Sequence, residues 1–298
     1  MSWQAKLLTG ALRRWVKPKS VPAQDIAASR ALAGKVPFGA KLARGWQVRP
    51  VDGAVLKGEW IEPAGPTQSR CILYFHGGAY IAFTAKSYRA ITSRLAVWSG
   101  TRLFALDYRL APEHPFPAAL DDAVAAYRAL IAAGTPAGGI VVAGDSAGGG
   151  LALALLVALR DAGDALPAAA VLMSPWTDLA ATGQSLIDNN ERDALFFGSW
   201  IAPTARHYLG DTPATDPLAS PVYADLTGLP PLLVQVSDTE VLLDDSRRVV
   251  ENARRAGVQA TLRVWPGLPH VWQFFATLLP EGRAALREAA DFVRSALP

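Results

Sequence analysis

Cysteine is almost absent from this sequence, with Cys71 the single example among 298 residues. No internal disulfide can form, so nothing requires an oxidising compartment, and we expect a cytoplasmic location. Only four histidines accompany this cysteine, which leaves little material for a zinc site. The sequence therefore predicts neither a disulfide-stabilised fold nor a bound metal.

Charged residues and long apolar runs are also scarce. Asp, Glu, Lys and Arg make up 18% of the chain, whereas hydrophobic residues reach 51%. This much apolar surface must be buried, which excludes disorder, collagen and coiled coil. The longest strongly apolar run, Leu151–Leu159, is nine residues, which is about half of what a membrane span needs. We expect a soluble globular protein with no membrane span.

Positive charge is concentrated at the N-terminus. Residues 1–50 hold ten Lys or Arg and one acid, Asp25, whereas the rest of the chain holds 19 basic and 25 acidic residues. A nucleic-acid partner is not predicted, because this basic surplus lies in one short segment without a groove-reading motif.

The first twenty residues predict an amphipathic helix and lack the continuous apolar stretch of a signal peptide. Its apolar residues fall at helical spacing on one face: Trp3, Leu7, Leu8, Ala11, Leu12 and Trp15. We expect this face to pack over a larger body, because an amphipathic helix needs one apolar surface to cover. A helix lying on an anionic membrane is the alternative.

From residue 46 onward, short apolar runs alternate with helical segments. An antiparallel pair is predicted at Gln47–Val51 and Ala54–Ile61, around an Asp-Gly turn. Further strands are predicted at 71–75, 103–108, 139–143, 168–173, 231–236 and 261–265. Helices are predicted at 87–98, with Ser87 as N-cap, and at 117–133, 147–162, 243–256 and 271–297. This alternation is typical of parallel strands buried on both faces.

Residues 177–223 break the alternation with a long aromatic, proline- and glycine-containing segment. A loop of that length is uncommon unless it forms a lid or a binding loop. We therefore expect one α/β catalytic domain over residues 46–298, with a mostly parallel sheet flanked by helices. Its helical cap is expected to consist of N-terminal helices within residues 1–45 and this insertion.

A G-x-S-x-G pattern centred on Ser146 stands between an apolar strand and an apolar helix. A serine on such a sharp turn is strained, and the helix start offers unpaired N–H groups beside its hydroxyl. A second glycine pair, Gly77 and Gly78, follows an earlier strand. Such glycines let backbone N–H groups face an oxyanion, to which the N–H of Ala147 adds a further donor.

A general base and an acid are also required, and their order along the chain is informative. In an α/β-hydrolase the histidine lies on the loop after the last strand, and His270 meets that condition. The acid should follow the strand at 231–236, where both Asp238 and Glu240 stand. A carboxylate there would fix the histidine tautomer and stabilise the imidazolium. Spacing alone leaves both acids open.

Three stretches together resemble one known family. Residues 76–80 read HGGAY, residues 107–118 read DYRLAPEHPFPA and residues 144–149 read GDSAGG. These are similar to motifs of the hormone-sensitive-lipase-like branch of the α/β-hydrolases, also termed bacterial family IV esterases, with Ala79 where a third glycine is usual. The resemblance covers residues 45–298 and implies the α/β-hydrolase fold.

The resemblance also implies roles for individual residues. The family carries its acid in D-P-L-x-D, and residues 240–244 read EVLLD, which selects Glu240 with Asp238 as fallback. The oxyanion hole is expected from Gly77, Gly78 and Ala147. Five aromatic residues are expected to line the substrate pockets, although each could equally belong to the core. They are Tyr80, Trp176, Phe196, Phe197 and Trp200.

The implied activity is hydrolysis of short- to medium-chain carboxylic esters through an acyl-enzyme on Ser146. Such a serine carboxylesterase takes a small-molecule ester and needs no cofactor. The resemblance also implies a homodimer formed through the last strand, near Thr261–Trp265. Two other classes stay open. An amidase or deacetylase uses the same machinery, and a hydrolase-like protein can bind a ligand without turnover, although the presence of His270 argues against the latter.

Overall fold

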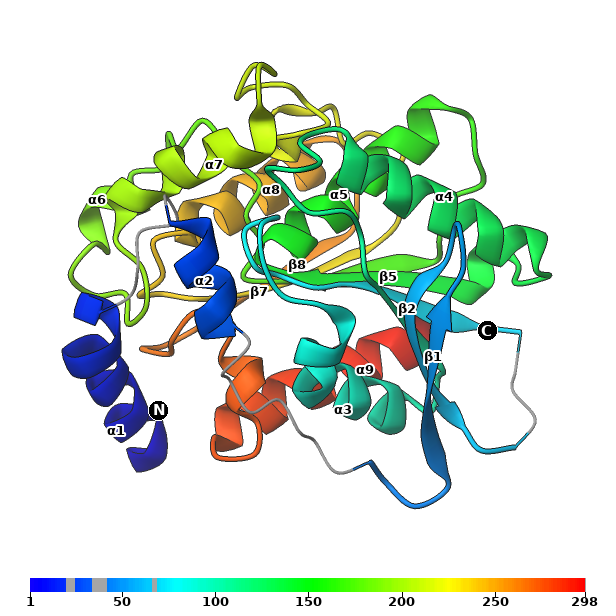
Figure 1. Cartoon of the computed structure of the whole chain (residues 1–298), viewed down its shortest axis with the longest axis horizontal. Coiled ribbons are helices and arrows are strands. Elements are labelled where there is room, and N and C mark those ends of the chain that lie inside the picture. The colour runs from blue at the N-terminus through cyan, green and yellow to red at the C-terminus, as the bar shows by residue number, and fades with distance from the viewer. Residues whose placement is uncertain (20–24, 34–41, 66–68, 298) are drawn as a thin grey trace.

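An eight-stranded sheet forms the centre of the molecule (Figure 1). The computed structural model describes residues 1–19, 25–33, 42–65 and 69–297. The strands, in chain order, are β1 Trp46–Asp52, β2 Lys57–Pro63, β3 Cys71–Phe75, β4 Leu103–Leu106, β5 Ile140–Asp145, β6 Ala169–Met173, β7 Leu232–Ser237 and β8 Ala260–Trp265. In the sheet they stand in the order β1-β2-β4-β3-β5-β6-β7-β8.

The sheet is antiparallel at one edge and parallel elsewhere, as the sequence predicts. β2 pairs antiparallel with both β1 and β4, while the other neighbouring strands run parallel. Phe75 pairs with Gly144, and Asp145 pairs with Met173. The carboxyl ends of these strands therefore lie together at one end of the sheet, where ligands bind in open α/β folds. We term this end of the strands the sheet edge from here on.

Helices cover both faces of the sheet (Figure 1). One face carries α3 Arg89–Ser99 and α9 Pro280–Ala296. The other carries α4 Ala118–Ala132, α5 Ala147–Asp161 and α8 Leu243–Arg255. Because both faces are covered, the central strands are buried throughout, which explains their nearly continuous apolar sequence.

Two helix starts differ from the prediction. Ser87 lies in a 3₁₀ turn, Ala85–Tyr88, and α3 begins at Arg89 without a side-chain cap, so the expected Ser87 N-cap is wrong. The helix expected from residue 271 is also interrupted. A short 3₁₀ helix, Trp272–Phe275, comes first, and α9 begins at Pro280. Proline favours the first turn because it lacks the N–H that a longer helix would use there.

The N-terminal helix packs over a larger body, as expected, but only part of the predicted face contributes, Leu8 among it. α1, Trp3–Ala11, continues as a π-helix to Val16 and buries Ala5 and Thr9. Trp3, Leu7 and Trp15 are exposed, so the expectation that they pack inward is wrong. Small residues at the contact allow close approach, and the Thr9 hydroxyl donates to the carbonyl of Gly267. Residues 20–24 and 34–41 of the expected N-terminal cap lie outside the described residues.

Residues 177–223, termed the insertion from here on, carry α6 Ser185–Asp188 and α7 Ile201–Leu209. In Figure 1 the insertion lies above the N-terminal helices α1 and α2 (Ile26–Ala33). Arg13 and Lys17 donate to backbone carbonyls of the insertion, those of Arg192 and Asp193 respectively. The division of the chain into cap and catalytic domain stays a prediction. Within the described ranges, no helix is long and apolar enough to cross a bilayer.

Candidate active site

Ser146 stands on a sharp turn between β5 and α5. Its backbone has φ 51° and ψ −123°, a strained conformation for a residue with a Cβ. The strand and helix cross so closely here that a Cβ on Gly144 would collide with the carbonyl oxygen of Gly148. The turn leaves Ser146 partly exposed between buried neighbours. This geometry presents its hydroxyl at the sheet edge, as expected for a nucleophile elbow.

His270 and Glu240 form a buried pair on the loops that follow β8 and β7. The Nδ1 atom of His270 lies 2.6 Å from Oε2 of Glu240. A carboxylate can only accept, so Nδ1 carries the proton. Asp238, the other acid that the sequence leaves open, is 39% exposed in its side chain and accepts the N–H of Gly267. The geometry therefore pairs the histidine with Glu240.

The other oxygen of Glu240 is held just as firmly. Oε1 accepts the Ser174 hydroxyl at 2.8 Å and the N–H of Ser237 at 2.7 Å. Ser174 directly follows Met173, whose carbonyl accepts the N–H of Ser146. A short chain of contacts along the sheet edge thus connects Ser146 with Glu240.

The second ring nitrogen of His270 is available for proton transfer. Its Nε2 is buried and has no hydrogen-bond partner among the described residues. Burial alone would lower the pKa of His270, but the charge and hydrogen bond of Glu240 outweigh burial and leave this pKa above its ordinary value. The carboxyl of Asp145, which precedes Ser146 in the sequence, also raises the pKa of His270.

The glycine loop at residues 76–80 faces this edge of the sheet after β3, and one of its expected donors is already engaged. The N–H of Gly77 donates to Oδ1 of Asp145 at 3.1 Å. A buried carboxylate therefore already accepts this N–H, and the expected contribution of Gly77 to an oxyanion hole stays a prediction. Among the described residues, the N–H groups of Gly78 and Ala79 have no acceptor. Ala147 opens α5, where N–H groups lack helical partners.

Asp145 ties this loop to the strand that carries Ser146. Its Oδ1 also accepts the Tyr74 hydroxyl at 2.6 Å. Complete burial raises the pKa of Asp145 to about 7, although the hydrogen bond from Tyr74 opposes the increase. The loop geometry is thus fixed by an aspartate whose sequence position, inside the serine motif, gave no hint of this role.

Comparison with known proteins agrees with the fold. A family model described as the α/β-hydrolase fold matches residues 72–274, which is most of the chain. This chain is an α/β-hydrolase. Within that superfamily it belongs to the bacterial esterases related to hormone-sensitive lipase, since a solved esterase of that family is 42% identical, covers 100% of this chain and 99% of its own, and superposes with a TM-score of 0.90.

Other relatives carry related names. An acetyl-hydrolase of Streptomyces hygroscopicus is 49% identical over 80% of this chain and 79% of its own. An esterase of Acinetobacter venetianus is 38% identical over 84% of this chain and 82% of its own. The crystal structure of the esterase EstE5, soaked with p-nitrophenyl butyrate, superposes with a TM-score of 0.91 at 39% identity and covers 99% of both chains.

The expected pocket residues of this α/β-hydrolase occupy different surroundings. The Phe196 ring packs edge-on against His270, with centroids 5.0 Å apart. Tyr80 and Trp176 are buried in the core beneath α5, where Tyr80 stacks on Tyr208 at 3.7 Å. Phe197 and Trp200 contact each other edge-on within the insertion. Contact with substrate stays a prediction for all five residues, and the position of Phe196 favours it most directly.

Sequence reasoning missed the residues that position the pair. Asn189 donates its side-chain amide to the carbonyl of Glu240 at 2.8 Å, and the carboxylate of Asp193 accepts the N–H of Val241 at 2.9 Å. Both lie in the irregular part of the insertion, where no motif or period marks them. Ser174 had one usable signal, because it follows a strand that ends at the same edge as β5 and β7.

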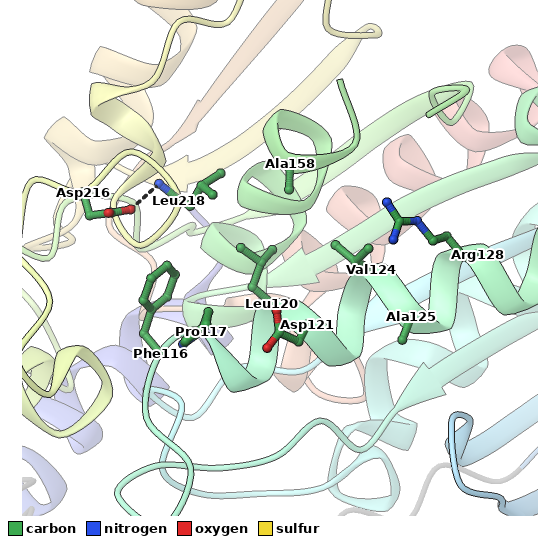
Figure 2. Close-up of a pocket in the computed structure, with 10 residues that line it drawn as sticks. All are labelled: Phe116, Pro117, Leu120, Asp121, Val124, Ala125, Arg128, Ala158, Asp216 and Leu218. Atoms are coloured by element: carbon green, nitrogen blue, oxygen red, sulfur yellow. Dashed lines mark hydrogen bonds between the residues drawn. The ribbon is translucent and has the colours of Figure 1, made fainter. Parts of the chain in front are cut away.

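A separate cavity lies away from this site. Figure 2 shows it beside α4, with Phe116, Leu120 and Leu218 among the residues that line it. In the same view Asp216 accepts the N–H of Leu218 at 2.9 Å. None of the three residues expected to form the triad lines this cavity, so it contributes nothing to the candidate active site.

Proposed function

We propose that this α/β-hydrolase is a serine carboxylesterase in which Ser146, His270 and Glu240 form the catalytic triad. The 2.6 Å contact between His270 and Glu240 carries the proposal, because it fixes the tautomer that leaves Nε2 free to act as a base. The strained turn at Ser146, on the same sheet edge, supplies the nucleophile. Bacterial esterases of the same family support the choice of an ester as substrate.

The reaction then follows from the positions of these groups. His270 Nε2 takes the hydroxyl proton of Ser146 while Oγ attacks the ester carbonyl carbon. The carbonyl oxygen becomes negative and is stabilised by the N–H groups of Gly78, Ala79 and Ala147. When the intermediate collapses, His270 returns the proton to the leaving alcohol. His270 then takes a proton from a water molecule that attacks the acyl-enzyme, and collapse of this second intermediate returns the proton to Ser146 Oγ and releases the carboxylic acid. These steps require no metal or organic cofactor.

A panel of p-nitrophenyl esters from acetate to palmitate tests this proposal. We expect short- to medium-chain esters to be hydrolysed by the wild type, and Ser146→Ala to lower kcat by about 10⁴- to 10⁶-fold. Ser199→Ala, at an exposed serine of the insertion, is the matched control and should leave kcat unchanged. Ester hydrolysis that survives in folded Ser146→Ala would overturn the proposed nucleophile.

Deacetylation is a second candidate, which the name of the Streptomyces hygroscopicus relative favours. The same triad would attack an acetyl ester or an N-acetyl group. Adding acetylated alcohols and acetamides to the panel separates the two. Amide turnover faster than ester turnover would identify an amidase. If neither substrate is turned over but an ester raises the melting temperature, the protein would be identified as a binding protein.

Three further expectations remain proposals. β8 is the outermost strand on its side of the sheet, and Val264 in it is exposed. This supports a homodimer formed through β8, which light scattering of the purified protein would test. A cytoplasmic location is supported by the lone buried Cys71. Short- to medium-chain specificity awaits the ester panel.

A further inference from the structure

The N-terminal helix exposes three large apolar side chains. Trp3 is 69% exposed, and Leu7 and Trp15 are each 64% exposed. We term these three residues the tryptophan face. Large exposed apolar clusters are unusual on a globular protein and commonly mark a contact with a partner or a membrane.

The helix itself is firmly attached, so the exposure does not come from a loose terminus. On its opposite side, Ala5 joins a cluster that includes Trp272 and Leu279. The Ser2 hydroxyl donates a hydrogen bond to the carboxylate of Glu281 at 2.9 Å, and the Thr9 hydroxyl donates one to the carbonyl of Gly267. The tryptophan face is therefore a second apolar surface on a helix whose packing requirement is already met.

The segment that carries this face is itself basic. Lys6, Arg13 and Arg14 are exposed on the same helical segment, and no acidic residue precedes Asp25 in the sequence. Arg13 donates to a carbonyl of the insertion, whereas Lys6 and Arg14 extend beside Leu7 and Trp15 in sequence. The charge of this segment therefore favours an occupant that combines apolar volume with negative charge.

We propose that the tryptophan face docks on a bilayer containing anionic lipids. Indole rings settle at the depth of the headgroups, where their apolar surface leaves water and their N–H group stays hydrated. Lysine and arginine at the same level attract anionic headgroups. A helix that combines the two lies in the plane of the interface. The proposal concerns binding and does not depend on the proposed ester hydrolysis.

Docking here would bring the candidate active site close to the bilayer. In Figure 1, α1 lies at the margin of the molecule, next to the insertion. Lys17, at the end of the same segment, donates to the carbonyl of Asp193, and Phe196 of this turn packs on His270. A bound enzyme would thus present the insertion side of its site to lipid-dissolved molecules.

Vesicle co-sedimentation of the full chain tests the proposal without any ester. One set of vesicles is pure phosphatidylcholine, and the other contains about one third phosphatidylglycerol. One variant replaces the tryptophan face with serine (Trp3→Ser, Leu7→Ser and Trp15→Ser), and another removes charge (Lys6→Gln and Arg14→Gln). The matched control makes the same kinds of change in the β1–β2 hairpin, at exposed Val55→Ser and Lys57→Gln.

We expect the wild type and the hairpin control to bind anionic vesicles, with binding weakened by salt. Each helix variant should bind about tenfold or more weakly, while its thermal melting stays unchanged. Equal binding to both vesicle types, or undiminished binding by the helix variants, would overturn the proposal. The proposal would also be overturned if the wild type did not bind vesicles but formed dimers, and the serine variant did not form them. A second copy of the chain would then cover this face.

Discussion

The sheet edge and the insertion meet at His270 and are built in different ways. At the sheet edge, parallel strand ladders fix where Ser146 and Glu240 leave the sheet. The insertion contributes no strand to the sheet within its described residues, and hydrogen bonds of Asn189 and Asp193 attach it to the turn that holds Glu240. The proposed reacting groups thus lie on turns that directly follow strands of the sheet, whereas side chains of the insertion hold the turn of Glu240 in place.

This difference predicts a hierarchy of mutational effects. Loss of a reacting group at the sheet edge removes a chemical step, so its effect is large. Loss of a support in the insertion leaves the chemistry present but less well aligned, and its effect is intermediate. A substitution that touches only backbone strain changes stability by a small amount.

The largest effect tests the acid at the sheet edge. We expect Glu240→Gln to lower kcat for p-nitrophenyl butyrate by about 10⁴-fold, because an amide does not enforce the histidine tautomer or stabilise the imidazolium. Asp238→Asn is the matched control two residues away and should change kcat by less than about threefold. The opposite ranking would transfer the role of the acid to Asp238.

An intermediate effect tests the insertion through pH. The active form of His270 is neutral, and a raised pKa means that wild-type kcat/KM should rise with pH through a midpoint above 6.5. Asp193 adds negative charge that raises the pKa of His270. Asp193→Asn should therefore shift this midpoint to lower pH and reduce the plateau about tenfold through poorer alignment.

The control for this pH prediction is Asp52→Asn, because Asp52 is an exposed carboxylate on the distant hairpin. It should leave both the midpoint and the plateau unchanged. A loss of plateau activity in Asp193→Asn without any movement of the midpoint would mean that Asp193 acts through structure alone.

A smaller effect tests the contact between the N-terminal segment and the insertion. Lys17 is buried, donates to the carbonyls of Asn190 and Asp193, and lies 4.2 Å over the Phe197 ring. Lys17→Met keeps the length but removes the donors, so we expect unfolding free energy to fall by about 1–2 kcal/mol and KM to rise. Exposed Lys86→Met should change neither, as measured by urea unfolding and ester kinetics. Equal behaviour of the two variants would show that the contact contributes nothing.

The smallest effect concerns backbone strain in the glycine loop. Ala79 has φ 55°, in the left-handed region that disfavours a Cβ. Ala79→Gly should raise the unfolding free energy by about 0.5 kcal/mol, since relief of strain exceeds the added flexibility of the unfolded chain. Ala137→Gly, outside any positive-φ position, should lower stability instead. Thermal melting of both variants measures these effects. A lower melting temperature for Ala79→Gly than for the wild type would contradict this explanation.

Much of the fold and part of the site could be predicted from local sequence. Short apolar runs predicted the strands, because a strand buried on both faces is built mostly of apolar residues. Ser146 was identifiable because a tight strand-to-helix crossing requires glycines at fixed positions. The sequence analysis predicted one continuous final helix, whereas Pro280, which favours the first turn of a helix, begins a separate one.

The sequence by itself determined the order of the elements and supplied a candidate nucleophile, a candidate base and two alternative acids. Spacing left both acids open and the family resemblance favoured Glu240, whereas the tertiary structure shows that it is Glu240 that contacts His270, since hydrogen bonds around this turn orient the two carboxylates differently. The tertiary structure also engaged the N–H of Gly77 with Asp145 and turned the tryptophan face outward. Local sequence specifies which side chains exist, whereas contacts between distant segments decide which of their atoms remain available.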